Sequence, residues 1–115
     1  MKDFYEEIQY KNKTYKLVFN LNVMENVQEE YGTLEKLVEL ISNEETEINA
    51  KAVIYIFTQM LNEGIDIANE ENGTDDKMLT TKQVGRMITE IGLTEAAVKI
   101  NKTVAGSTKG EEKNE

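Results

Sequence analysis

The longest run of apolar positions lies near the middle of the chain, from residue 50 to about residue 71. It opens with six consecutive apolar residues, Ala52 to Phe57, and apolar side chains continue at helical spacing through Leu61 to Ala68. A buried strand is the alternative for Val-Ile-Tyr-Ile-Phe, but buried strands are usually about 4–8 residues long, and this pattern extends well beyond that. Asn49 is a favourable N-cap residue immediately before the run. The pattern therefore predicts a central helix that is apolar around most of its circumference and buried.

Two segments before this helix, residues 4–10 and 15–21, alternate between apolar and polar side chains. A period of two indicates strands with one buried face. The positions expected on that face are Phe4, Ile8 and Tyr10 in the first strand and Tyr15, Leu17, Phe19 and Leu21 in the second. The polar link between them contains Asn12, which tolerates the left-handed conformation of tight turns. We expect a β-hairpin whose apolar face packs on helices, because an isolated hairpin is only marginally stable.

Capping residues divide the rest of the chain into further helices. The expected N-caps are Asn22, Thr33, Thr80 and Thr94, and the expected stops are Gly32, Gly73 and Gly92. Residues 106–115 contain no large apolar side chain, which is typical of a disordered tail. The predicted fold is α+β and mostly α: an N-terminal β-hairpin packed on a bundle of about five helices, with the central buried helix at about 50–71. It forms a single domain, residues 1–105, followed by a disordered C-terminal tail, residues 106–115.

The net charge of the chain limits the kinds of molecule that it is expected to bind. The formal net charge of this chain of 115 residues is −9, and residues 43–80 alone contribute −7, from nine acids and two lysines. Nucleic-acid binding draws its affinity from cations that neutralise phosphates, so we expect no nucleic-acid partner. The apolar run is too short and too interrupted to span a membrane, and acids occupy the N-terminal positions where a signal peptide is apolar. We therefore expect a cytoplasmic protein.

The residues that usually carry catalysis are scarce. The chain has no histidine and no cysteine, so neither Ser42 nor Ser107 has a histidine to activate it. The glycines do not form a phosphate-binding loop. A calcium loop with Gly73 at its sixth position would have Ala68 and Leu79 at its first and twelfth positions, and neither is a ligand. We predict a non-enzymatic protein with no catalytic residue, no cofactor and no metal site.

The sequence contains more apolar side chains than can be buried around one central helix. Five short helices and a hairpin cannot all surround it fully, so some side chains of the last two helices are expected at the surface. The candidates are Met87, Ile91, Val98 and Val104. Together they would form a patch that binds an amphipathic partner helix. The alternative is that these residues belong to the core.

The stretch from Tyr15 to Leu37, YKLVFNLNVMENVQEEYGTLEKL, carries a family resemblance. It combines the second hairpin strand, an Asn-capped helix ending in Glu-Glu-Tyr-Gly, and a Thr-capped leucine-rich helix. The central apolar helix and the later Leu-Thr-Thr-Lys-Gln-Val-Gly segment agree with it. Over about residues 8–105 the chain resembles the tail assembly chaperones of long-tailed phages and prophages of Gram-positive bacteria.

This resemblance implies a function in virion assembly. Such chaperones are thought to coat the aggregation-prone helices of the tape measure protein until tail tube protein displaces them. They act in the cytoplasm of the bacterial host cell and are absent from the mature virion. In many of these phages a translational frameshift adds a C-terminal extension. We also expect the isolated protein to be a monomer or weak homo-oligomer.

Two other functions stay open on the sequence. The −7 charge of residues 43–80 would suit an acidic inhibitor that mimics nucleic acid, and another small phage-encoded adaptor protein is a further alternative. Salt separates the inhibitor from the chaperone, because screening weakens charge-driven binding far more than it weakens the burial of apolar helices.

Overall fold

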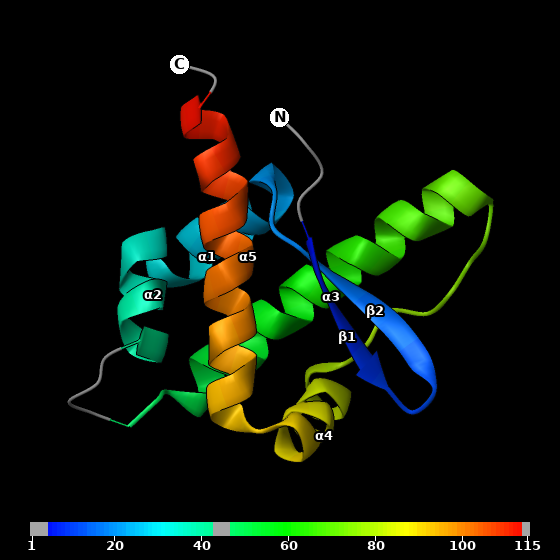
Figure 1. The fold of residues 1–115 in the computed structure, drawn as a ribbon, viewed down its shortest axis with the longest axis horizontal. Helices are drawn as coiled ribbons and strands as arrows, with labels where there is room; N and C mark the ends of the chain where they lie inside the picture. The colour runs from blue at the N-terminus through cyan, green and yellow to red at the C-terminus, as the bar shows by residue number, and fades with distance from the viewer. Residues whose placement is uncertain (1–4, 43–46, 114–115) are drawn as a thin grey trace.

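The computed structural model describes residues 5–42 and 47–113, with side chains up to residue 108. Its elements follow one another as β1 (Tyr5–Tyr10), β2 (Lys13–Val18), α1 (Leu21–Tyr31), α2 (Leu34–Ser42), α3 (Ala50–Asn72), α4 (Thr81–Ile91) and α5 (Leu93–Lys113), as Figure 1 shows. The predicted fold class is confirmed: an N-terminal antiparallel hairpin accompanies five helices in the described residues. None of the helices in this part of the chain is long and apolar enough to cross a membrane.

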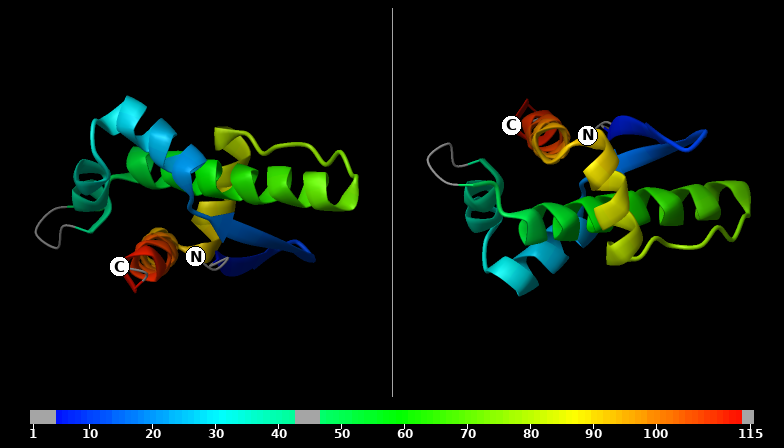
Figure 2. Two further views of the ribbon diagram at one scale, coloured as in Figure 1. Left: turned by 90° about the horizontal axis from the view of Figure 1, so that it is seen from above. Right: turned by 90° about the horizontal axis from the view of Figure 1, so that it is seen from below.

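The centre of the fold is α3, as the apolar pattern predicts. Its side chains Phe57 and Leu61 are fully buried, and the helix contacts β2 and all four other helices. Figure 2 shows α1 on one side of α3 and α5 with the hairpin on the other. Asn49 caps the helix, its side chain accepting a hydrogen bond of 2.9 Å from the Ala52 N–H. Gly73, with a left-handed φ of 65°, ends it at the position that the sequence indicates.

The hairpin is tighter than the sequence suggests. A two-residue turn connects Tyr10 and Lys13, and both of its residues, Lys11 and Asn12, have positive φ, at 52° and 63°. Positive φ at both central positions is the requirement of the turn that fits the twist of two paired strands. The second strand therefore runs from Lys13 to Val18 instead of residues 15–21.

Three of the six described positions on the expected hairpin face are buried, and Tyr10 and Tyr15 are half-buried. Ile8, Leu17 and Phe19 belong to the core, and β2 packs directly on α3. Leu21 was expected on the same face, but it is 77% exposed because the helix α1 begins there. Phe4 lies outside the described residues.

The start of α1 corrects one predicted cap. The N-cap is Asn20 rather than Asn22, and the Asn20 side chain accepts from the Val23 N–H at 3.2 Å. The Asn20 amide also donates to Glu63 Oε2 of α3 at 2.8 Å. This contact across 43 residues fixes Asn20 in place. The cap of α2 agrees with the prediction, because Thr33 Oγ1 accepts from the Lys36 N–H at 3.1 Å.

The helix α4 begins with the expected capping box of Thr80 and Gln83 and ends at Gly92. The next helix differs from its prediction at both ends. It begins at Leu93, directly after Gly92, so Thr94 lies inside the helix and is not its cap.

At its other end α5 continues through residues 106–113, so the helix end predicted near residue 105 is wrong. Ser107 is buried, and Thr108 Oγ1 donates to the Val104 carbonyl at 3.0 Å. Residues 114–115 of the expected tail lie outside the described residues.

The loop between α3 and α4 runs back beside α3 and sets the position of α4 (Figures 1 and 2). Two asparagines of α3 hold its backbone. The Asn69 side chain accepts from the Asp76 N–H at 2.9 Å. The Asn62 amide forms two bonds with Leu79, donating to its carbonyl at 2.9 Å and accepting from its N–H at 2.8 Å. The contact with Leu79, two residues before α4, holds the start of that helix beside the middle of α3.

Candidate interaction groove

The four residues predicted to bind a partner do not form one surface. Met87 and Val104 are buried, at 2% and 8% exposure, so their expected exposure is wrong. Ile91 is half-buried, and Val98 is 41% exposed. The physical reason is the hairpin, which covers more of the last two helices than expected: β1 and β2 contact α5, and Tyr10 and Tyr15 share a hollow with Met87. A role for Ile91 and Val98 in partner binding stays a prediction.

An open, mostly apolar groove of about 550 Å³ lies between α3 and α4. The first two turns of α3 contribute Lys51, Ile54 and Tyr55, and the first turn of α4 contributes Thr81 and Lys82. Its size falls within the range of about 300–1,000 Å³ that is common for small-ligand pockets. We therefore take this groove as the candidate functional site.

Close packing of the two helices defines the floor of the groove. Gly85 of α4 faces Ile54 of α3, and a Cβ built on Gly85 would lie 3.7 Å from Ile54 Cδ1. With no side chain at Gly85, Ile54 is left partly open to solvent instead of being covered by α4. A partly buried isoleucine at the floor of a hollow is available to an apolar partner side chain.

Tyr55 lines the groove in a fixed orientation. Its hydroxyl donates to the Asn26 carbonyl of α1 at 2.9 Å, and its ring meets that of Tyr31 edge-on, with centroids 5.5 Å apart. Burial raises the pKa of the Tyr55 hydroxyl, and the nearby carboxylate of Glu30 raises it further. The Tyr55 hydroxyl is therefore uncharged at neutral pH. Its hydrogen bond and ring contact hold the side chain in place.

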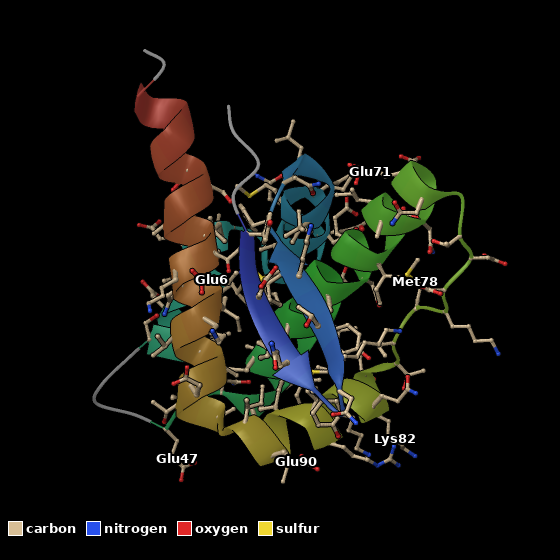
Figure 3. The ribbon with its side chains drawn as sticks, turned by 45° about the vertical axis from the view of Figure 1, so that its right-hand side comes forward. Glu6, Glu47, Glu71, Met78, Lys82 and Glu90 are labelled. Atoms are coloured by element: carbon tan, nitrogen blue, oxygen red, sulfur yellow. The ribbon has the colours of Figure 1, made fainter. Side chains whose placement is uncertain are left out.

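The charged side chains at the groove are positive, although the chain as a whole is acidic. Lys51 and Lys82 both line it, and both are exposed. Figure 3 shows Lys82 on α4, far from Glu71 at the end of α3. Neither α3 nor α4 has an acidic residue in its first turn. Acids are the favoured residues near helix starts, so the lysines at these two starts are the sequence feature that points to this groove, although Lys36 in the first turn of α2 shows the same feature outside it.

The groove carries few polar groups. Its side chains supply two ammonium groups and the hydroxyls of Tyr55 and Thr81, and the sequence has no histidine to act as a base. Among the described residues, no group of three or more acidic, histidine or cysteine side chains is arranged to hold a metal ion. No protein-family model, no curated protein and no solved structure matches the chain.

Proposed function

We propose that this chain is a non-enzymatic phage tail assembly chaperone. It binds apolar and amphipathic helices of a tape measure protein in the host cytoplasm, keeps them soluble until tail tube protein takes their place, and is absent from the mature virion. The observation that carries the proposal is the open apolar groove between α3 and α4, with Ile54 at its floor. The resemblance over about residues 8–105 and the mostly helical fold with its hairpin support it.

The groove gives the partner helix a place to bury apolar side chains. An amphipathic helix laid on such a groove is anchored by residues at helical spacing. Each apolar side chain that leaves water contributes about 25 cal/mol per Å² of buried surface. Ile54 and Tyr55, which line the groove, are held by packing and by the bond from Tyr55 to Asn26, so little ordering is required on binding.

The rest of the surface keeps the complex soluble. Five exposed acids lie on the last turns of α3 and in the following loop: Asp66, Glu70, Glu71, Asp75 and Asp76. This end of α3 extends away from the other helices in Figure 1. Repulsion between such acidic ends opposes aggregation of chaperone molecules that carry apolar cargo.

Coexpression with fragments of a tape measure protein tests the proposal. The wild-type chain should keep these fragments soluble, and Ile54→Gln, which places a polar side chain at the groove floor, should lose most of that effect. Val98→Gln is the comparison variant, because Val98 is an exposed apolar residue on α5 outside the groove and tests the binding surface that the sequence predicts there. The unfolding midpoints of both variants establish that they are folded. Fragments that precipitate with wild-type chain would contradict the proposed function, and loss of solubility with Val98→Gln alone would move the binding surface to α5.

The exposed acids at the end of α3 favour one second candidate, an acidic inhibitor that mimics nucleic acid. Its binding to a DNA-binding protein would weaken steeply with salt and would be indifferent to Ile54→Gln. Solubilisation of apolar helices should persist at high salt. Titration of both activities from low to high salt with the same two variants therefore separates the two functions.

A further inference from the structure

We infer that the groove between α3 and α4 selects apolar helices that carry carboxylates beside their apolar face. This inference rests on the proposed function and names the kind of helix that the groove binds. Two positive side chains, Lys51 from α3 and Lys82 from α4, line an otherwise apolar surface. A helix whose apolar side chains enter the groove brings its flanking residues next to these two ammonium groups.

The positions of the two lysines are unfavourable for the helices that carry them. Each is the second residue of its helix, Lys51 after Ala50 and Lys82 after Thr81. The start of a helix carries a partial positive charge, so acids are stabilising there and lysines are not. Local departures from such stability rules are expected where function requires them. Helix stability therefore does not explain two lysines that converge on one groove.

The charge at the groove is opposite in sign to the net charge of the chain. With a formal net charge of −9, the chain as a whole repels an acidic helix, whereas Lys51 and Lys82 attract it locally. On the α1 side, Glu29 and Glu30 influence Tyr55. The partner's carboxylates are therefore expected on the side that faces the helix starts, away from α1. This arrangement of charge favours a partner helix that carries carboxylates, and it favours one orientation of that helix in the groove.

Two synthetic peptides provide a direct test. They share one leucine face and differ only in the flanking residue, which is glutamate in the first and lysine in the second. Binding to the full chain is followed by fluorescence anisotropy. At low salt the wild type should prefer the glutamate peptide by about tenfold, which is the effect of two exposed ion pairs. The preference should shrink as salt rises.

Charge reversal in the protein supplies the matched pair of variants. Lys51→Glu with Lys82→Glu should invert the preference, so that the lysine peptide binds more tightly. The same change places an acid in the first turn of both helices and should raise the unfolding midpoint, so that lost binding cannot be attributed to unfolding. Lys36→Glu with Lys102→Glu alters the net charge equally at exposed positions of α2 and α5 and should keep the wild-type preference.

The outcomes separate this inference from the proposed function. Equal binding of both peptides, or an unchanged preference in the groove variant, overturns the charge selection and leaves apolar helix binding intact. If neither peptide binds the wild type, the inference is wrong. Coexpression with tape measure fragments then decides whether the proposed function is wrong too.

Discussion

Two glycines inside helices have opposite structural roles. A Cβ added at Gly64 of α3 would lie 2.5 Å from the carbonyl oxygen of Lys16, because β2 crosses α3 at that point with the two backbones in close approach. A Cβ added at Gly85 of α4 would meet only Ile54 Cδ1, at the ordinary contact distance of 3.7 Å. Glycine therefore permits the packing of the hairpin on α3 at residue 64, and at residue 85 it only leaves the groove floor open.

The same substitution should have opposite effects at these two positions. Gly64→Ala should lower the free energy of unfolding by about 1–3 kcal/mol, since β2 must move away from α3. Gly85→Ala should raise it by about 0.5–1 kcal/mol, because alanine is the better helix residue and the space is available. Chemical denaturation of both variants measures the difference. Stabilisation by Gly64→Ala would show that the hairpin does not lie this close to α3.

At the scale of elements, the loop between α3 and α4 depends on the side-chain amide of Asn62. This amide pairs with both the N–H and the carbonyl of Leu79, next to the capping box that starts α4. The loop thereby determines where the α4 side of the groove lies.

Asn62→Ala should lower the free energy of unfolding by about 1–3 kcal/mol, since two partly buried backbone groups lose their partner. Hydrogen exchange at the Leu79 amide should accelerate more than exchange in the hairpin. Asn62→Asp is the control, because it keeps an acceptor for the Leu79 N–H and loses only the donor to the carbonyl. Unchanged exchange at Leu79 in the alanine variant would show that other contacts hold the loop.

Elements whose ends are determined by nearby residues could be predicted from the sequence. Asn49 and Thr80 each cap a helix with their own side chains, and Gly73 ends α3 through its left-handed backbone. These choices involve residues three or four positions apart, so the pattern contains the information. The central helix could also be predicted, because its apolar run is too long for a strand.

Features that depend on distant residues could not be predicted. Asn20 and Asn22 are equally able to cap a helix by residue type, and the side chains of both donate to Glu63 Oε2 of α3, at 2.8 and 3.1 Å. The burial of Met87 likewise depends on how the hairpin packs. The groove combines residues about thirty positions apart on two helices, and no local sequence pattern indicates that these residues lie close together. The lysines at the starts of α3 and α4 depart from a local rule, but Lys36 in the first turn of α2 does so as well.

At the scale of the whole molecule, every element of the described chain contributes to one buried cluster. The hairpin supplies Ile8 and Leu17, and each helix adds at least two side chains around those of α3. No element has a separate core that would keep it folded when α3 is lost. Such a cluster favours a single cooperative unfolding transition.

Phe57 tests this cooperativity, because it is a large side chain of α3 with no exposed surface. Phe57→Ala should lower the free energy of unfolding by about 3–5 kcal/mol, since it removes buried apolar surface and leaves a cavity. Val98→Ala, at an exposed position of α5, should change it by less than about 0.5 kcal/mol. Circular dichroism reports the helices, and amide exchange at Ile8 and Leu17 reports the hairpin. Both should lose stability by the same amount in Phe57→Ala. A hairpin that kept its protection while the helices weakened would show two independent units, and α3 would then not be the centre on which the groove and the hairpin both depend.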